Sequence, residues 1–299
     1  MRYTIILTTY KEPKTIGKAI EQIVIPNVDI WKKLSLIIVA TDNETIKSAK
    51  KSISTLPIKD RIQIIQDKGL GKPEALNLAV KTKGVSGSAL ILTDGDVYVS
   101  NNAIKAIINK MEETNANIVS GHPISKDNRN SKFGFYSHLF CAAADYKRNK
   151  DKKTPASGYL YAIKEWENIF PIPKDIRAED AYISQKMLEQ GYHIEYAKDA
   201  TVNVMFPKNT KDWLKQKTRS LGGNVQLKKF NTKQTRSLKE DLQMALFPLQ
   251  FAKNLKEYIY IMYLYPLRLY LWLKIFILNS MNKLGSGRWE SIKSSKEKE

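Results

Sequence analysis

Residues 88–96 read SALILTDGD. The apolar run at its centre is typical of a short strand that is buried on both faces. Asp94 and Asp96 follow at the end of this predicted strand, one residue apart and on either side of a glycine. Two carboxylates placed in this way can share a hard divalent cation and its phosphate ligands. The same residues are also good β-turn formers, so this segment alone leaves both a metal site and an ordinary acidic turn open.

Three similar apolar runs precede this segment, and helical patterns separate them. The predicted strands fall at residues 3–8, 34–39, 61–66 and 88–93. The predicted helices between them fall at residues 13–24, 44–55 and 73–82. Strands and helices that alternate at these lengths predict an α/β fold with a mostly parallel central sheet flanked by helices. Ligands of such sheets bind at the carboxyl ends of the strands, which is where the polar segments stand.

The composition limits the class of protein. The 299 residues include 49 Lys+Arg and 30 Asp+Glu, which gives a formal net charge of +19. The apolar content of 42% excludes a collagen-like or wholly disordered chain. Cys141 is the single cysteine, which excludes an intramolecular disulfide and a Cys-based zinc site and indicates a reducing compartment. The charge indicates a polyanionic partner, which can be nucleic acid, an anionic membrane or a phosphorylated substrate.

Much of the positive charge lies in one part of the chain. Ten basic residues fall between Met205 and Lys239, and Asp212 is the one acidic residue that opposes them. The aromatic-rich apolar segment Leu242–Leu284 follows directly. A basic run beside an apolar run is expected at the cytoplasmic face of a membrane. Because the sequence shows no nucleic-acid-binding module, we expect no nucleic-acid partner; a solvated lysine-rich face remains the alternative.

Residues 253–279 read as one helix. Its charged residues are Lys253, Lys256, Glu257, Arg268 and Lys274. They share a stripe of roughly 120° on a helical projection, and the rest of the surface is apolar. The segment 258–278 is long enough to span a membrane, but charges within a span are costly. We expect a helix that lies in the membrane interface or is re-entrant, with a true span and an ordinary core helix as alternatives.

Three further segments carry groups that could take part in chemistry. The glycine-rich loop Lys68–Lys72 precedes a predicted helix and can approach a phosphate, although its spacing is not that of a P-loop. Glu179 and Asp180 begin an amphipathic pattern, where they favour the helix dipole or supply a general base. Gln216 and Arg219 share one face of a predicted helix and can grip a diphosphate or an acceptor, or simply belong to a basic helix.

Taken in order, these segments resemble glycosyltransferase family 2, and especially its membrane-associated synthase-like branch. The resemblance covers about residues 3–230 and is strong because the motifs occur together and in sequence. The motifs are TTYKEP at 8–13, Asp42, GKPEALN at 71–77, DGD at 94–96, Ser157-Gly158, Glu179-Asp180 and QKTR at 216–219. The resemblance implies the GT-A (Rossmann-like) fold, followed by C-terminal amphipathic and hydrophobic helices. It implies domains at 1–230 for the glycosyltransferase, 231–284 for membrane-associating helices and 285–299 for a flexible basic tail.

The resemblance also implies roles for individual residues. Nucleotide-sugar binding would fall to Thr8, Tyr10, Glu12, Asp42, Lys72, Asp94, Gln216 and Arg219. Asp94 and Asp96 match the D-x-D motif, which implies Mg²⁺ or Mn²⁺ on the diphosphate. Ser157 and Gly158 would line the acceptor site, and Asp180, next to Glu179 in the E-D motif, would be the catalytic base. Ser220 stands where the family's Q-x-x-R-W motif has a tryptophan that contacts the acceptor sugar, which favours a single addition over processive synthesis.

The implied activity is an inverting, metal-dependent sugar transfer at the cytoplasmic face of the membrane. The donor would be a nucleotide-diphosphate sugar, expected to be a UDP-sugar, and the acceptor a hydroxyl of a glycan or glycolipid in polysaccharide or glycolipid biosynthesis. The alternatives are transfer to a polyprenyl-phosphate lipid carrier, sugar-phosphate nucleotidyl transfer, and a non-catalytic basic protein that binds membranes or nucleic acid. Nucleotidyl transfer is disfavoured because Lys11-Glu12-Pro13, and not a glycine-rich loop, follows the first predicted strand.

Overall fold

An eight-stranded sheet forms the centre of the molecule. The computed structural model describes residues 1–285, so the tail predicted for 285–299 lies, apart from Gly285, outside the described residues. The strand order is β3-β2-β1-β4-β7-β6-β8-β5. The strands are β1 (Tyr3–Thr9), β2 (Leu34–Ala40), β3 (Ile62–Gln66), β4 (Ala89–Asp94), β5 (Tyr98–Val99), β6 (Ile118–Ser125), β7 (Leu160–Ile163) and β8 (Ile194–Val204).

Most neighbouring strands are parallel, as the alternating pattern predicts. β1 lies between β2 and β4 and runs parallel to both, and β3 extends this half of the sheet. β7 is inserted antiparallel between β4 and β6, and β5 runs antiparallel to β8 at the far edge. The register pairs Thr8 with Asp94. The carboxyl ends of β1 and β4 therefore reach the same edge of the sheet.

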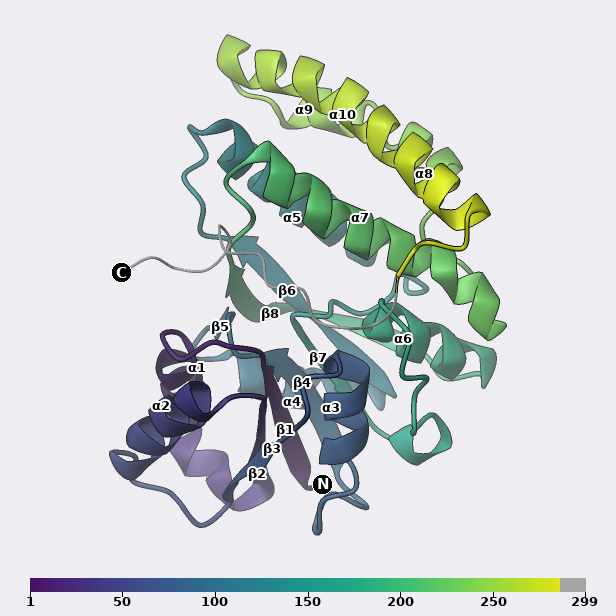
Figure 1. Ribbon diagram of the computed structural model, residues 1–299. Helices are drawn as coiled ribbons and strands as arrows, with labels where there is room; N and C mark the ends of the chain where they lie inside the picture. Colours follow the sequence, from purple (N-terminus) through teal and green to yellow (C-terminus); the bar gives the residue numbers. More distant parts are fainter. Residues whose placement is uncertain (286–299) are drawn as a thin grey trace.

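Helices cover both faces of this sheet (Figure 1). The helices before the C-terminal region are α1 (Ile16–Val24), α2 (Asn43–Ser54), α3 (Lys72–Ala79), α4 (Ala103–Thr114), α5 (Lys132–Lys150), α6 (Glu179–Glu189) and α7 (Thr210–Gln226), with 3-10 turns at Ile25–Lys33, Trp166–Asn168 and Leu227–Phe230. Successive side chains of a strand point to opposite faces. Accordingly, Ile5 and Leu7 join the core beneath α1, α2 and α4, whereas Ile6 joins the core beneath α3 and α6.

The C-terminal helices form a further layer over α5 and α7 (Figure 1). They are α8 (Leu238–Gln243), α9 (Phe247–Phe251) and α10 (Leu255–Ser280). Phe135 of α5, Trp213 of α7 and Leu264 of α10 are buried in one apolar cluster. Among the described residues, α10 is the one helix long and apolar enough to cross a membrane. The layered α/β architecture and the C-terminal apolar helix confirm the predicted fold class.

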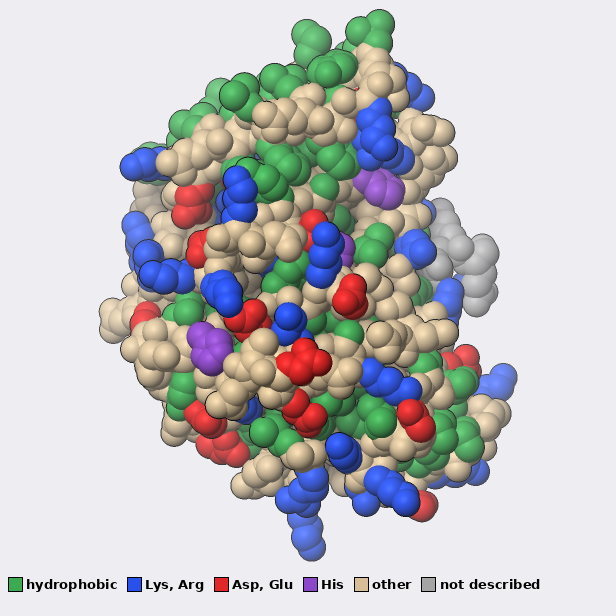
Figure 2. All heavy atoms as spheres, turned by 180° about the vertical axis from the view of Figure 1, so that it is seen from behind, with side chains coloured by type: hydrophobic (Ala, Val, Ile, Leu, Met, Phe, Trp, Pro, Cys, Tyr) green, Lys and Arg blue, Asp and Glu red, His purple; other side chains and the backbone are tan. Residues whose placement is uncertain are grey.

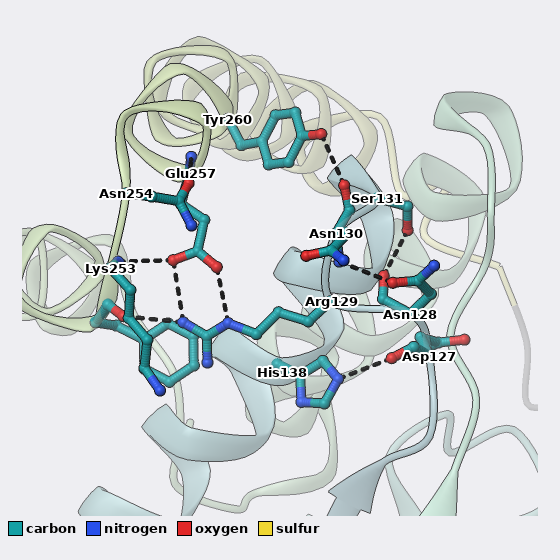
Figure 3. A network of polar contacts seen from close by, with 11 residues as sticks. Asp127, Asn128, Arg129, Asn130, Ser131, His138, Lys253, Asn254, Glu257 and Tyr260 are labelled. Carbon is teal, nitrogen blue, oxygen red and sulfur yellow. Dashed lines mark hydrogen bonds and ion pairs between the residues drawn. The ribbon is translucent and has the colours of Figure 1, made fainter.

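A polar network fastens the start of α10 to the loop before α5 (Figure 3). Arg129 Nε donates to Glu257 Oε1 at 2.8 Å, and Arg129 Nη2 donates to the Phe251 carbonyl at 3.1 Å. Glu257 is 5% exposed, and the hydrogen bond from Arg129 lowers its pKa against the opposing effect of burial. Tyr260 donates to the Asn130 carbonyl at 3.1 Å. Glu257, which belongs to the predicted charged stripe, therefore faces the domain.

The outward face of α10 is apolar. Figure 2 shows hydrophobic side chains gathered at the top of the molecule, over this helix. The most exposed of them are Leu255, Met262, Tyr263, Leu269, Leu273 and Phe276. Arg268, also from the charged stripe, points inward and pairs with Asp241 of α8. We call the six exposed side chains the outer face of α10.

Candidate active site

The carboxyl ends of β1 and β4 open into a cavity of about 1300 Å³. Its walls come from the segments after β1 and β4, from the turn before β7, from α3, α5, α6 and α7, and from the C-terminal helices. The predicted site residues in its walls are Thr8, Tyr10, Glu12, Lys72, Asp94, Asp96, Ser157, Gly158, Glu179, Asp180, Gln216 and Arg219. The fold thus collects these residues, which are scattered along the sequence, around one space.

Lys72 joins two of the acidic motifs. It opens α3 after the turn at Gly69 and Gly71, whose φ angles of 68° and 131° suit glycine. Its Nζ lies 2.8 Å from Asp94 Oδ1 and 3.0 Å from Glu179 Oε1, and donates to the Gly158 carbonyl at 3.1 Å. Burial lowers the pKa of Lys72, but Asp94 and Glu179 raise it to a net value above normal. The ammonium is therefore charged and held inside the protein.

The D-x-D segment has room only for glycine at its centre. Thr8 Oγ1 donates to Asp94 Oδ1 at 2.8 Å, and the Gly95 N–H donates to the Thr8 carbonyl at 2.9 Å. A Cβ at position 95 would lie 2.7 Å from Thr9 Cβ and 2.9 Å from Glu12 Oε2. Gly95 therefore lets the turn after β4 pack against the end of β1. This packing presents Asp94 and Asp96 to the cavity.

Asp94 and Asp96 fit a divalent cation that arrives with a diphosphate. Within residues 1–285 no group of three or more His, Cys, Asp or Glu side chains is placed to hold a metal. The chain thus supplies two carboxylates at this point and not a closed site. Mg²⁺ is commonly bound by one or two carboxylates together with substrate phosphates, which matches this donor set.

Asp180 lies against Gly158. A Cβ at position 158 would stand 2.8 Å from Asp180 Oδ2, so the absence of a side chain there makes space for the carboxylate. Asp180 Oδ1 accepts from the Ala181 N–H at 2.9 Å in the first turn of α6. Burial, followed by the nearby Glu179, raises the pKa of Asp180. A carboxylate with a raised pKa in a cavity has the properties of a general base.

The α7 motif faces the same space. Asn209 caps this helix by accepting from the Asp212 N–H at 2.9 Å. Gln216, Arg219 and Ser220 line the cavity, and Gln216 Oε1 is buried without a hydrogen-bond partner among the described residues. Buried polar atoms without a partner are rare, and at a cavity wall they can serve a ligand.

Asp42 is the predicted site residue that does not line the cavity. It is the N-cap of α2, where Oδ1 accepts from the Thr45 N–H at 2.9 Å. Its Oδ2 accepts from Thr45 Oγ1 at 2.8 Å and from the Lys11 N–H at 3.1 Å. These bonds fix the segment after β1, so the structure gives Asp42 a structural role. Its predicted contact with the nucleotide stays a prediction.

The cavity also contains cations that the motif analysis did not single out. Three of them are Arg148 of α5, Lys217 of α7 and Arg236 before α8. Lys217 occupies a variable position of Q-x-x-R, and Arg236 is one of many basic residues in the run at 205–239. Arg148 lies outside every motif. Nothing in the local sequence separates these three from surface lysines and arginines.

The strand order and the cavity at the ends of β1 and β4 place the molecule in the GT-A class of glycosyltransferases. The chain belongs to a family described as "Glycosyltransferase like family 2", whose model matches residues 1–223. It is therefore a transferase that uses a nucleotide-sugar donor, and the predicted family is confirmed.

Solved structures share this fold. The mannosyltransferase PcManGT from Pyrobaculum calidifontis, in complex with GDP-Man and Mn²⁺, has a TM-score of 0.66 at 19% identity, covering 95% of this chain and 87% of its own. TarS 1–349 from S. aureus in complex with UDP has a TM-score of 0.52 at 14% identity, covering 83% of this chain and 70% of its own. A comparison with curated proteins gave no match.

Proposed function

We propose that this enzyme transfers a sugar from a nucleoside-diphosphate sugar, expected to be a UDP-sugar, to a hydroxyl of a glycan or lipid-linked acceptor with inversion. One observation carries the proposal: Asp180 lies in the same cavity as Asp94, and its neighbour Glu179 is joined to Asp94 through Lys72. The structures of similar fold that hold GDP-Man with Mn²⁺ or UDP support a donor of this class.

The chemistry follows from these positions. Asp180 accepts the proton of the acceptor hydroxyl while the hydroxyl oxygen bonds to the anomeric carbon. The bond from that carbon to the diphosphate oxygen breaks, and its electron pair leaves with the nucleoside diphosphate. A single displacement of this kind inverts the anomeric centre. Arg219 would supply positive charge beside the leaving diphosphate, and Lys72 would offset part of the negative charge of Asp94 and Glu179 there.

Asp94 and Asp96 would hold the divalent cation, either Mg²⁺ or Mn²⁺. When bound there, the ion supplies positive charge that neutralises the diphosphate as it leaves. Asp94 also stays anchored by Thr8, whose hydroxyl donates to it at 2.8 Å. That hydrogen bond fixes the orientation of this carboxylate toward the cavity.

The decisive experiment is Asp180→Asn, with donor binding measured apart from turnover. We expect turnover to fall by about 10²–10⁴-fold while the affinity for the nucleotide sugar stays the same. The raised pKa means that the ionised carboxylate costs stability at neutral pH, so the ligand-free variant should unfold at an equal or higher temperature. Asp199→Asn, on an exposed residue, is the control. Unchanged sugar transfer in Asp180→Asn would refute the base assignment.

We also propose that the outer face of α10 lies in the membrane interface, at the cytoplasmic side. The inner face of the helix is held to the loop before α5 by the pair of Glu257 with Arg129, and to α8 by the pair of Arg268 with Asp241. A helix whose inner face is fastened in this way is better suited to lie along a membrane than to cross it.

A further inference from the structure

The helix α7 has a second set of contacts on the face that presents Gln216 and Arg219 to the cavity. Gly223 and Gln226 follow Arg219 by four and seven residues, and such positions share one face of a helix. Gln216 and Arg219 line the cavity, whereas the two later residues do not. The last turns of this face therefore contact another part of the protein.

The side-chain amide of Gln226 binds the segment that leads into α6. Gln226 is 6% exposed, and its Oε1 accepts from the Arg177 N–H at 3.3 Å. Its Nε2 donates to the carbonyl of Asp175 and to the carbonyl of Gly285, each at 3.2 Å. Both N–H donors of the amide are therefore used. The amide joins α7 to the segment before α6 and to the segment after α10.

Gly223 lets α7 lie directly against the same segment. A Cβ at position 223 would stand 3.0 Å from Arg177 Cβ and 3.2 Å from Ala178 Cβ, so only glycine fits without displacing the segment. Ile176 and Ala178 are buried in a small apolar cluster with Leu227, which follows α7. The segment before α6 is thus held by packing as well as by hydrogen bonds.

The segment held by α7 runs directly into the proposed base. Arg177, Ala178, Glu179 and Asp180 all line the cavity, and α6 begins at Glu179. The N-cap residue of α6 is Ala178, which supplies no capping hydrogen bond. Lys72 holds Glu179 at 3.0 Å, and the residues before Glu179 are held by α7. The contacts with α7 therefore help to fix where the first turn of α6 stands.

We propose that Gly223 and Gln226 are positioning residues, through which α7 sets the place of Asp180 in the cavity. The proposal rests on the proposed function, because it concerns the base of that reaction. Arg219 and Gln226 lie about 10 Å apart along the helix at 1.5 Å per residue. One helix thus fixes the base relative to Arg219, and the bond to Gly285 extends this support to the segment after α10.

Two neighbouring glycines make a matched test. Gly223→Ala adds a Cβ against Arg177 and Ala178, whereas the Cβ of Gly222→Ala meets the flexible end of Leu284, at 3.2 Å from Cδ2. Both changes raise the helix propensity equally. We expect the turnover number for sugar transfer to fall at least about tenfold in Gly223→Ala and less than about twofold in Gly222→Ala, because a displaced catalytic group is costly. The affinities for UDP and GDP with Mn²⁺ should stay the same in both variants.

A double-mutant cycle shows whether Gly223 acts through the base. In the Asp180→Asn background, Gly223→Ala should lower turnover little further, because residues that act through one another are not additive. Gln226→Met removes the three hydrogen bonds but keeps the length of the side chain, and it should behave in the same way. Its control is Asn27→Leu, which replaces another buried amide in the 3-10 turn Ile25–Lys33, outside the cavity wall, and should leave turnover unchanged.

Several outcomes would contradict the proposal. Equal turnover in Gly223→Ala and the wild type would exclude the positioning role, as would equal losses in the two glycine variants. A loss of nucleotide affinity in Gly223→Ala would show that α7 and Arg219 move instead of the segment before α6. If Gly223→Ala does not fold, Gln226→Met decides by the same measurements. Additive losses in the double variant refute this inference alone, whereas unchanged transfer in Asp180→Asn refutes the base assignment of the proposed function.

Discussion

Lys72 holds three parts of the active-site wall at one ammonium group. Its three N–H donors are directed at Asp94, Glu179 and the Gly158 carbonyl, which come from β4, α6 and the turn before β7. A lysine ammonium has three donors, so these contacts use all of them. Lys72 therefore positions the acidic groups relative to one another. The sequence motif predicts only that a positive charge is needed near the diphosphate.

Replacing Lys72 should cost stability. Lys72→Met keeps the apolar stem but leaves Asp94 and Glu179 without their counter-charge, and we expect the free energy of unfolding to fall by about 3 kcal/mol. The folded pKa is raised, so the stabilisation is fully present below the unfolded value of about 10.4 and is lost only above it. Urea denaturation at neutral pH measures the change, with the exposed Lys68→Met as control. A loss below about 1 kcal/mol would contradict the positioning role.

Gly158 makes a sharper test of geometry. A Cβ there would lie 2.8 Å from Asp180 Oδ2, so Gly158→Ala must displace the carboxylate. We expect the turnover number to fall by about 10²-fold, the scale of a misplaced catalytic group, with donor affinity retained. Gly17→Ala is the control, because its added Cβ would have ordinary contacts 3.7 Å from Ser52 Cβ. Steady-state kinetics with normal turnover in Gly158→Ala would show that the close contact is unimportant.

The sequence predicts the active-site residues that belong to local motifs. It does not predict the cavity residues that only tertiary packing brings together. Asp94, Asp96 and Lys72 stand beside glycines at the ends of predicted elements, and the structure collects them in one cavity. Arg148 and Arg236 have no such setting. They meet only because the fold brings α5 and the segment before α8 to the wall of one cavity. This juxtaposition depends on tertiary packing that no local pattern encodes.

At the scale of elements, a helical projection of α10 shows which charged residues share one face of the helix. It does not show whether that face points toward the domain or away from it. The charged stripe of residues 253–279 is present, and Glu257 and Arg268 both belong to it. In the structure these two residues face the domain, together with the buried Ile261, Leu264 and Leu271. The side facing away from the domain is the apolar one. The direction depends on partners, Arg129 and Asp241, that lie far away in the sequence.

The pair of Arg129 and Glu257 should control whether α10 stays docked. Arg129→Met leaves the buried Glu257 carboxylate with the Lys253 N–H as a donor at 2.7 Å but without its counter-charge, and we expect a loss of about 2 kcal/mol because Arg129 itself is partly exposed. The pKa of Glu257 is lowered in the folded state. Its contribution is therefore present above the unfolded value of about 4.3 and is lost as pH falls through the folded value.

Hydrogen exchange is the measurement that locates this effect. Amides of α10 should exchange faster in Arg129→Met than in the wild type at neutral pH, and those of β1 should change less. The two proteins should become alike at low pH, where Glu257 is protonated in both. Lys126→Met removes an exposed charge from the same loop region and serves as control. Equal protection of α10 at neutral pH would show that the apolar cluster alone holds the helix.

At the scale of the whole molecule, the net charge of +19 serves more than one purpose. Within the basic run at 205–239, Lys217, Arg219, Lys233 and Arg236 line the cavity, whereas Lys211, Lys228 and Lys239 are exposed outside it. We propose that the first set binds phosphate groups of substrates. We propose that the second set faces an anionic membrane surface. Composition alone gives only the sum of these two contributions.

Membrane attachment should depend on the outer face of α10 more than on charge. Leu269 and Phe276 are 66% and 71% exposed, and burial of a large apolar side chain in lipid contributes about 1.5–3 kcal/mol. The double variant Leu269→Glu and Phe276→Glu should therefore lower the partition coefficient on anionic vesicles by at least about 10²-fold in flotation assays. Ile25→Glu with Val28→Glu places the same charges on exposed apolar residues away from the C-terminal layer and should float like the wild type. A contrary result would be that high salt releases the wild type from the vesicles as completely as it releases the Leu269→Glu, Phe276→Glu variant. That result would show that the exposed lysines alone explain membrane binding, and it would contradict the placement of the outer face of α10 in the membrane interface.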